Sequence, residues 1–371
     1  MRRLVLREIL AIALILLCLE GGYRLYKMWR YGLVDYPDVL VVGYFQPDPR
    51  YGMVLTKSFS SASVSPKVRA DPDLKRFFGA KYTTNSRGFR GPEVAVPKPA
   101  GTFRVVVLGE STSLGMEMDD DQTWPARLEA LLQADPGFLK AHGAARVEVV
   151  NASNGAWRTR EGLIRLKEEV GSLDPGMVLV AFNWTDGTQG TEGVDPERVN
   201  IVPKPWWRHS KVAENLWIRA GRLEASDVRH QEKLRQELRR DRTWARACER
   251  HLVEMQALCR EIGAEMVLVD MPGLCRPGAA PDSEEFRAVV DRTRVTPANY
   301  PFWADMKVLM SGMFSDIGRE QGVRVAGVSR EFDTFTGPER VDLFVDEMHP
   351  NRRGAEKVAL AVERSLTEPA L

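Results

Sequence analysis

The sequence predicts an α/β fold: one doubly wound parallel sheet with helices on both faces, preceded by an apolar N-terminal helix. From residue 103 onward, short apolar runs alternate with segments of helical period. The apolar runs lack polar alternation, which is typical of parallel strands that are buried on both faces. Regular alternation of this kind favours a single sheet over two separate domains.

Each predicted element follows from its local pattern. The predicted strands cover residues 105–108, 147–151, 177–182, 265–270 and 323–328. Thr123 is a suitable N-cap for the helix after the first strand, and Pro125 fits the first turn of that helix. Further helices are predicted at residues 159–170, 246–262 and 355–366.

Composition and charge bound the possible functions. The chain has 371 residues, of which 44% are hydrophobic and 28% charged, as in ordinary globular proteins. The formal net charge of +1 gives no reason to expect a bulk affinity for nucleic acid or acidic polymers. Four cysteines are too few and too scattered for a disulfide scaffold. A Cys259–Cys275 bridge and buried thiols both stay open.

The N-terminus carries a membrane signal. Arg2, Arg3 and Arg7 precede an apolar run from Ile9 to Leu19. We expect residues 1–27 to form an uncleaved signal anchor, a transmembrane helix with its N-terminus inside. The rest of the chain would then lie outside the cytoplasm, in the periplasm or on the outer face. A cleaved signal peptide and a buried N-terminal helix are the alternatives.

The remaining chain divides into a leading region and a main domain. Residues 28–101 are the juxtamembrane leading region, and residues 102–371 form the domain, with insertions at about 188–245 and 272–300. The first insertion holds Trp206 and Trp207, which could line a groove, touch the membrane or pack on the core. A charged helix over residues 222–242 is interpreted as a solvated face. The basic residues of the loop from Tyr82 to Glu93 are interpreted as solvated loop charges, with a role at a site as the alternative.

Ser111 is a candidate nucleophile because of where it follows the first strand. That strand ends at Gly109, so Ser111 sits at the carboxyl edge of the predicted sheet, where open α/β sheets place their sites. A serine held between a buried strand and a helix can act as a nucleophile when a base is close.

His349 is the histidine with an evident partner. Asp346 precedes it by three residues, and Pro350 follows it and restrains its backbone. Asp346 could fix the imidazole tautomer and leave the other ring nitrogen free to take a proton from a serine. The other four histidines, at positions 142, 209, 230 and 251, lie among charged residues without an obvious partner.

Taken together, these segments resemble the SGNH, or GDSL-type, hydrolase superfamily, and in particular its membrane-anchored bacterial members. The resemblance covers about residues 82–366 and rests on the block G-[DE]-S-x-x-x-G at Gly109–Gly115 and on Asp346-x-x-His349. It implies a flavodoxin-like sheet, with Ser111 as nucleophile, His349 as general base and Asp346 as its orienting carboxylate. The Ser111 N–H would be one donor of the oxyanion hole.

Two other blocks depart from the family pattern. The family's second block has a glycine as oxyanion donor, and here Ala156 stands at that position with Gly155 before it. The third block normally supplies an asparagine, but Thr185 stands there, and Asn183 lies two residues earlier. We expect the backbone N–H of Gly155 or Ala156, and Asn183 or Thr185, to complete the oxyanion hole.

The leading hypothesis is an esterase that works through an acyl-serine intermediate. Transfer of the acyl group to a carbohydrate hydroxyl, removal of acetyl groups from an envelope polysaccharide, and a non-catalytic envelope binding module are the alternatives. The sequence contains no metal, nucleotide or flavin motif, so we expect no cofactor. Asp119, Asp120 and Asp121 are interpreted as a solvated loop. The expected partners are an acyl ester or acylated carbohydrate and the membrane, without nucleic acid.

Overall fold

The computed structural model describes residues 2–32, 42–72, 74–199, 210, 212–213, 216, 228–279, 283–293 and 295–368. Trp206, Trp207 and His209 lie outside the described residues, as do the first residues of the predicted charged helix.

The core of the molecule is a five-stranded parallel sheet in the order β4-β3-β5-β6-β7. Its strands are β3 (Thr102–Gly109), β4 (Arg146–Asn151), β5 (Met177–Ala181), β6 (Glu265–Val269) and β7 (Arg324–Ala326). In chain order this is the 2-1-3-4-5 arrangement of flavodoxin-like folds. The prediction of one parallel sheet is confirmed, although β7 is shorter than the apolar run that predicted it.

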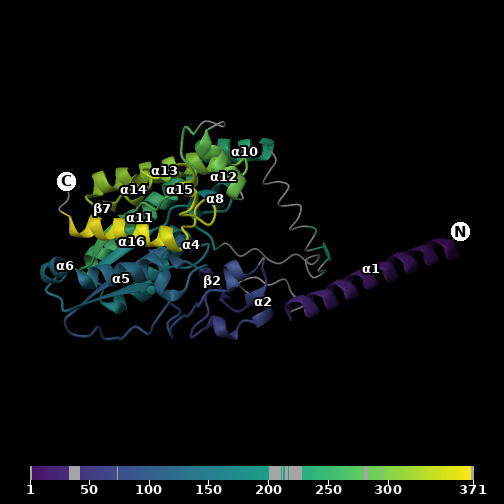
Figure 1. Cartoon of the computed structure of the whole chain (residues 1–371), viewed down its shortest axis with the longest axis horizontal. Coiled ribbons are helices and arrows are strands. Elements are labelled where there is room, and N and C mark those ends of the chain that lie inside the picture. The colour runs from purple at the N-terminus through teal and green to yellow at the C-terminus, as the bar shows by residue number, and fades with distance from the viewer. Residues whose placement is uncertain are drawn as a thin grey trace.

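Helices cover both faces of the sheet (Figure 1). Val105 and Val107 of β3 point into a core with α5 (Trp124–Ala134) and α16 (Arg352–Thr367). Val106 and Leu108 point into the opposite core with α7 (Thr159–Arg165), α11 (Thr243–Glu261) and α13 (Tyr300–Gln321). Alternate residues of one strand thus serve two apolar cores, which is why the strand reads as a continuous hydrophobic run.

The other elements connect this framework. They are α4 (Ser111–Leu114), α6 (Pro136–Ala141), α8 (Thr185–Thr191), α10 (Val228–Arg240), α12 (Glu284–Arg292), α14 (Val328–Phe332) and α15 (Gly337–Val341). Thr123 caps α5 as predicted, since its side chain accepts a hydrogen bond from the Ala126 N–H. The predicted helix over residues 159–170 is α7 followed by a π-helical turn, Leu166–Val170.

The leading region forms elements that the sequence pattern did not indicate. It contains an antiparallel hairpin of β1 (Phe45–Asp48) and β2 (Gly52–Leu55), and the short helices α2 (Pro66–Ala70) and α3 (Lys75–Phe78). These elements enclose a third apolar cluster, whose aromatic members include Tyr44, Phe59 and Tyr82. The cluster also contains Leu114 of α4, so the leading region packs directly beside the predicted nucleophile.

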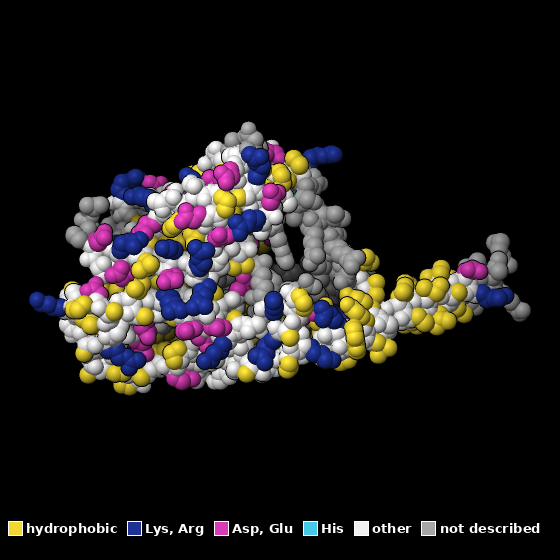
Figure 2. Space-filling model, viewed as in Figure 1, with side chains coloured by type: hydrophobic (Ala, Val, Ile, Leu, Met, Phe, Trp, Pro, Cys, Tyr) yellow, Lys and Arg dark blue, Asp and Glu magenta, His cyan; other side chains and the backbone are white. Residues whose placement is uncertain are grey.

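The N-terminal helix α1 (Arg2–Tyr31) projects away from the rest of the molecule (Figure 1). Its segment Arg7–Tyr31 is long and apolar enough to cross a membrane. Figure 2 shows apolar side chains along its exposed surface, and Leu17 is 69% exposed. The alternative of a buried N-terminal helix is therefore wrong. All four cysteines are free, so the Cys259–Cys275 bridge does not form, and both of those thiols are buried.

Candidate active site

Ser111 begins α4, separated by one residue from the end of strand β3. The turn between them needs Gly109, because a Cβ there would lie 2.7 Å from Ser113 Oγ and 3.0 Å from the Ala181 carbonyl oxygen. The sharp turn holds the Ser111 side chain, which is half-buried, at the carboxyl edge of the sheet.

The loop before α16 brings His349 onto Ser111. His349 Nε2 lies 2.8 Å from Ser111 Oγ, although the two residues are 238 positions apart. On the other side of the ring, His349 Nδ1 lies 2.8 Å from Asp346 Oδ1 and 2.9 Å from Oδ2. The same Oδ1 accepts the backbone N–H groups of Met348 (3.1 Å) and His349 (2.9 Å), which fixes the loop. The three predicted residues thus meet at one point.

The electrostatics of this group suit proton transfer from the serine. Burial works to lower the pKa of His349, but the hydrogen bond and charge of Asp346 raise it above its ordinary value. Burial works to raise the pKa of Asp346, yet the hydrogen bonds and charge of His349 lower it to about 2. Asp346 is thus a carboxylate that accepts the Nδ1–H, which leaves Nε2 as the acceptor of the Ser111 proton.

The second block lies against the same space. Ala156 has a φ of +58°, a left-handed conformation that turns the chain sharply after Gly155. The backbone N–H groups of Ser111, Gly155 and Ala156 have no hydrogen-bond acceptor within the described part of the chain. Both Gly155 and Ala156 line the cavity that contains Ser111 and His349. Ser111, Gly155 and Ala156 all line this cavity, so three residues whose backbone N–H groups have no acceptor in the described part of the chain lie beside it.

The third block does not offer a side-chain donor to this space. Asn183 is fully buried; its Nδ2 donates to the Val269 carbonyl at 3.0 Å, and its Oδ1 accepts from the Met271 N–H at 3.0 Å. Thr185 lines the cavity, but its hydroxyl donates to the carboxylate of Glu110. The expectation that Asn183 or Thr185 completes the oxyanion hole disagrees with these contacts, because each side chain already serves another partner.

Glu110, which the sequence analysis passed over, organises the third block. Its buried carboxylate accepts the N–H groups of Asn183 (2.9 Å), Trp184 (2.8 Å) and Thr185 (2.7 Å). Burial raises the pKa of Glu110 to about 7, against the effect of the hydrogen bonds from Thr185 and Asn183. The signal that could have indicated this role is the position of Glu110 immediately before Ser111, the predicted nucleophile.

Arg90, Asp119 and Asp120 make structural contacts and are not solvated as predicted, whereas Asp121 is exposed as predicted. The buried guanidinium of Arg90 donates to the carbonyls of Leu114 (2.7 Å), Gly115 (2.5 Å) and Met118 (2.5 Å) and lies over the Tyr82 ring. Asp120 accepts from Arg90 Nε at 3.2 Å and from the Thr83 N–H at 3.0 Å. Arg90 therefore holds the loop that follows Ser111 against the leading region.

His251 also differs from its prediction as a residue among surface charges. It is buried, and its Nδ1 lies 2.9 Å from the hydroxyl of Thr159, which donates to Asp186 at 2.8 Å. Asp186 also accepts the Thr159 N–H at 2.9 Å. This group joins α7, α8 and α11 and takes no part in the cavity beside Ser111.

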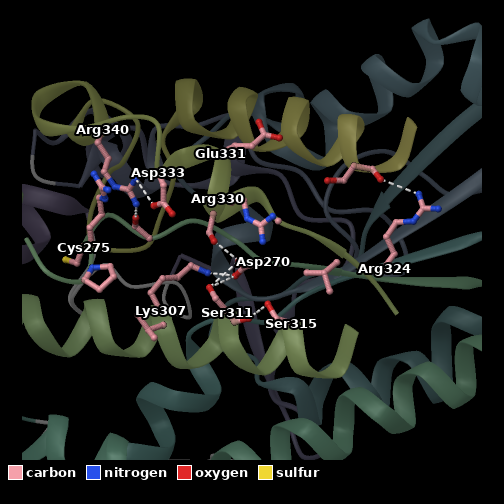
Figure 3. Close-up of a pocket in the computed structure, with 18 of the residues that line it drawn as sticks. Asp270, Cys275, Lys307, Ser311, Ser315, Arg324, Arg330, Glu331, Asp333 and Arg340 are labelled. Atoms are coloured by element: carbon pink, nitrogen blue, oxygen red, sulfur yellow. Dashed lines mark hydrogen bonds and ion pairs between the residues drawn. The ribbon is translucent and has the colours of Figure 1, made fainter. Parts of the chain in front are cut away.

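Two cavities differ sharply in chemistry. The cavity at Ser111 has a volume of about 460 Å³, and apolar side chains from several elements line it together with His349. A larger cavity of about 740 Å³ lies beside β6, β7 and α13 (Figure 3). There the carboxylate of Asp270 bonds the ammonium group of Lys307 and the hydroxyl groups of Ser311 and Ser329. The smaller cavity contains the predicted nucleophile, Ser111, in contact with His349.

Within the described residues, no group of three or more histidine, cysteine, aspartate or glutamate side chains could hold a metal ion.

Comparisons with known proteins give the following similarities. No protein-family model matches the chain. It is 33% identical to an arylesterase of Vibrio mimicus over 87 residues, which are 24% of this chain and 40% of that protein. The matched stretch thus spans about two fifths of that relative.

Similar solved structures include TesA (TM-score 0.41, 16% identity, 71% of this chain and 97% of that chain) and Axe2, an acetylxylan esterase from Geobacillus stearothermophilus (0.42, 14%, 71% and 94%). A GDSL-like lipase from Bacteroides thetaiotaomicron is also similar (0.36, 11%, 71% and 87%).

Proposed function

We propose that this chain is an SGNH-type serine esterase that cleaves carboxylic esters through an acyl-serine intermediate. The observation that carries the proposal is the contact of 2.8 Å between His349 Nε2 and Ser111 Oγ, with Asp346 on the far side of the imidazole. Acyl transfer needs a nucleophile, a base in contact with it and a carboxylate that orients the base. The similarity to an arylesterase over 87 residues agrees with this chemistry.

The reaction follows from the geometry. As Ser111 Oγ attacks the ester carbonyl carbon, its proton passes to His349 Nε2, and Asp346 stabilises the imidazolium that forms. The carbonyl oxygen becomes negative and accepts hydrogen bonds from the unpaired N–H groups of Ser111 and of Gly155 or Ala156. Collapse of the intermediate breaks the bond to the alcohol oxygen, which leaves with the proton from Nε2.

Water completes the cycle. Nε2 takes a proton from a water molecule as its oxygen attacks the acyl carbon, and the acid leaves as Ser111 recovers its proton. The oxyanion hole in this proposal consists of backbone donors alone. Loss of one oxyanion donor costs about 3 kcal/mol of transition-state stabilisation in other enzymes. We therefore expect slower turnover than in an enzyme whose third block also supplies a side-chain donor.

The test uses the full chain purified in detergent. It should release p-nitrophenol from a short-chain p-nitrophenyl ester, and a fluorophosphonate probe should label Ser111. Ser111→Ala should lose both reactions, whereas Ser172→Ala, at an exposed serine that bonds only to the Glu169 carbonyl, should keep both. If the folded protein neither turns over esters nor takes the probe, the non-catalytic binding module is the correct alternative.

A further inference from the structure

The walls of the cavity at Ser111 differ in chemistry from one side to the other. Apolar side chains come from the hairpin (Phe45 and Met53), from the loop after α4 (Met116 and Met118) and from the loop before α16 (Met348). Polar side chains come from α8, where Thr185, Thr188 and Gln189 face the same space. Glu117, which lies between Met116 and Met118 in the sequence, adds a carboxyl group to the lining on the apolar side. Methionine is flexible and polarisable, so a methionine-rich wall adapts to the shape of an alkyl chain.

The hairpin is fixed in place as one of these walls. The Met53 carbonyl accepts hydrogen bonds from Asn154 Nδ2 and Trp157 Nε1, each at 2.7 Å. These two residues flank Gly155 and Ala156, the source of the oxyanion donors. Phe45 packs so closely on Gly155 that a Cβ at that glycine would lie 3.1 Å from the Phe45 ring. The apolar wall and the oxyanion loop therefore form one rigid unit.

The size of the cavity argues against an acetyl group as the bound acyl part. Its volume of about 460 Å³ lies in the range of pockets that enclose a drug-sized molecule. A two-carbon acyl group would leave most of the methionine wall in contact with water. Burial of each additional methylene contributes about 0.8 kcal/mol, so a longer acyl chain uses this surface and an acetyl group does not.

The apolar wall is also continuous with the base of the N-terminal helix. Tyr31, the last residue of α1, packs on the same apolar cluster as Phe45, Met53 and Met116. Polar contacts hold this end of α1 to α2: Arg30 pairs with Asp71, and Lys67 Nζ donates to the Trp29 carbonyl at 3.0 Å. The apolar cluster that includes Phe45, Met53 and Met116 thus also contacts the base of α1, the membrane-length helix that projects from the molecule in Figure 1.

We infer that the ester cleaved at Ser111 carries a medium-length to long alkyl acyl chain, which lies against Phe45, Met53 and Met116 while the alcohol part faces α8. This inference rests on the proposed esterase function. Its substrate class is an acyl ester of an amphiphile. The ester reaches the cavity either as a dissolved monomer or from the lipid layer that holds α1.

The first experiment measures kcat/KM of the full chain in phosphatidylcholine nanodiscs for p-nitrophenyl esters from acetate to decanoate, each kept below its micelle concentration. We expect an increase of about fourfold per methylene until the cavity is full. Met53→Trp narrows the cavity and should lower the octanoate-to-acetate ratio of kcat/KM at least tenfold. Met116→Trp, on the other apolar wall, should act in the same direction. Val253→Trp, on the exposed face of α11, is the matched control and should leave the ratio unchanged.

The outcomes separate this inference from the proposed function. Ester turnover with a flat dependence on chain length, or with acetate preferred, overturns the inference and leaves the esterase intact. Absence of turnover and of fluorophosphonate labelling overturns both. Labelling of Met53→Trp and Met116→Trp at the wild-type rate shows that these variants are folded, so an unchanged ratio in both would also overturn the inference.

A second arm identifies the source of the ester. A long-chain fluorogenic ester is placed either in the same nanodiscs as the enzyme or in separate ones. Faster hydrolysis in the shared discs identifies the lipid layer as the source, and equal rates identify dissolved monomers. Hydrolysis of neither preparation, with acetate still cleaved, overturns the acyl-chain assignment.

Discussion

At the scale of single residues, Asp346 controls the protonation of His349, the base in the proposed mechanism. Its contact with His349 Nδ1 keeps the ring's other nitrogen free for Ser111 and raises the pKa of His349 above its ordinary value of 6.5. Since the base must be neutral to accept the proton, activity falls as the pH drops through the His349 pKa. We expect the acid limb of kcat/KM to have its midpoint above pH 6.5.

Asp346→Asn tests this assignment. The amide cannot stabilise the imidazolium, and its NH₂ group favours the wrong tautomer, so kcat should fall by about 10³–10⁴-fold. The midpoint of the residual acid limb should move to lower pH, because the charge that raised the pKa is gone. The pH profile of p-nitrophenyl ester hydrolysis measures both effects. Asp342→Asn, four residues earlier on the surface, should keep the wild-type profile; a loss of activity there, or none in Asp346→Asn, contradicts the assignment.

The contacts among Ser111, His349 and Asp346 could be predicted because each residue carries a local signal, whereas the partners of the Asn183 and Thr185 side chains could not. Asp346 precedes His349 at a short fixed spacing, and Ser111 follows a strand that ends in glycine. Asn183 and Thr185 follow the end of β5, where the chain turns into α8. The alternation of side chains between the two faces of a strand therefore does not predict their directions. Their real partners, Val269, Met271 and Glu110, are more than 70 residues away in the chain.

At the scale of elements, Arg90 joins the leading region to the loop after α4. Arg90→Lys keeps the charge but cannot reach the carbonyls of Leu114, Gly115 and Met118 together, since an ammonium lacks the guanidinium fork. We expect the free energy of unfolding to fall by about 2–4 kcal/mol, because buried carbonyl groups lose their donor. Urea denaturation measures this change. Arg87→Lys, in the same loop but half-exposed, should change stability little; equal effects of the two substitutions would refute a bracing role for Arg90.

Glu110 gives the site a pH-dependent stability. Its pKa is about 7 in the folded protein, against an ordinary value of 4.5. The folded state therefore retains a proton that the unfolded chain releases between these two values. The free energy of unfolding should consequently decrease by roughly 3 kcal/mol as the pH rises from 4.5 to 7, and this contribution should be complete below pH 4.5.

Glu110→Gln removes this titration and provides the comparison. Its unfolding free energy should lack the decrease between pH 4.5 and 7, even though Gln loses some of the acceptor capacity for the N–H groups of residues 183–185. Chemical denaturation at several pH values, with the wild type and the variant compared at each, measures the difference. Parallel curves for the two proteins would mean that Glu110 is ionised throughout this range.

The elements themselves were predictable to the extent that their patterns are local. The five core strands are apolar runs, and α5 has its cap in Thr123, so the sequence alone indicates them. The β1–β2 hairpin has strands of four residues and includes Pro47 and Gly52, which weaken any strand signal. Its place beside the active site depends on contacts of Met53 with Asn154 and Trp157, about 100 residues later.

At the scale of the whole molecule, α1 is the described element that is long and apolar enough to cross a membrane. A helix of 30 residues is about 45 Å long, which exceeds the roughly 30 Å hydrocarbon core of a bilayer. Its apolar surface is exposed, and its last turn is fastened to α2 through Arg30 and Asp71. We therefore propose that α1 remains attached as a membrane anchor, with residues 28–371 on the outer side of the cytoplasmic membrane.

Cell fractionation tests this placement. The full chain should sediment with membranes, resist extraction by alkaline carbonate and dissolve in detergent. A variant that lacks residues 2–27 loses the apolar run, so it should stay in the soluble fraction. It keeps Trp29 and Arg30 with their contacts to α2, so it should hydrolyse monomeric esters at the wild-type rate. Protease added outside intact spheroplasts should digest the full chain. If the N-terminal sequence of the mature protein instead begins after the apolar run, α1 is a cleaved signal peptide. The enzyme would then have no membrane anchor, and its esters would reach the cavity from solution.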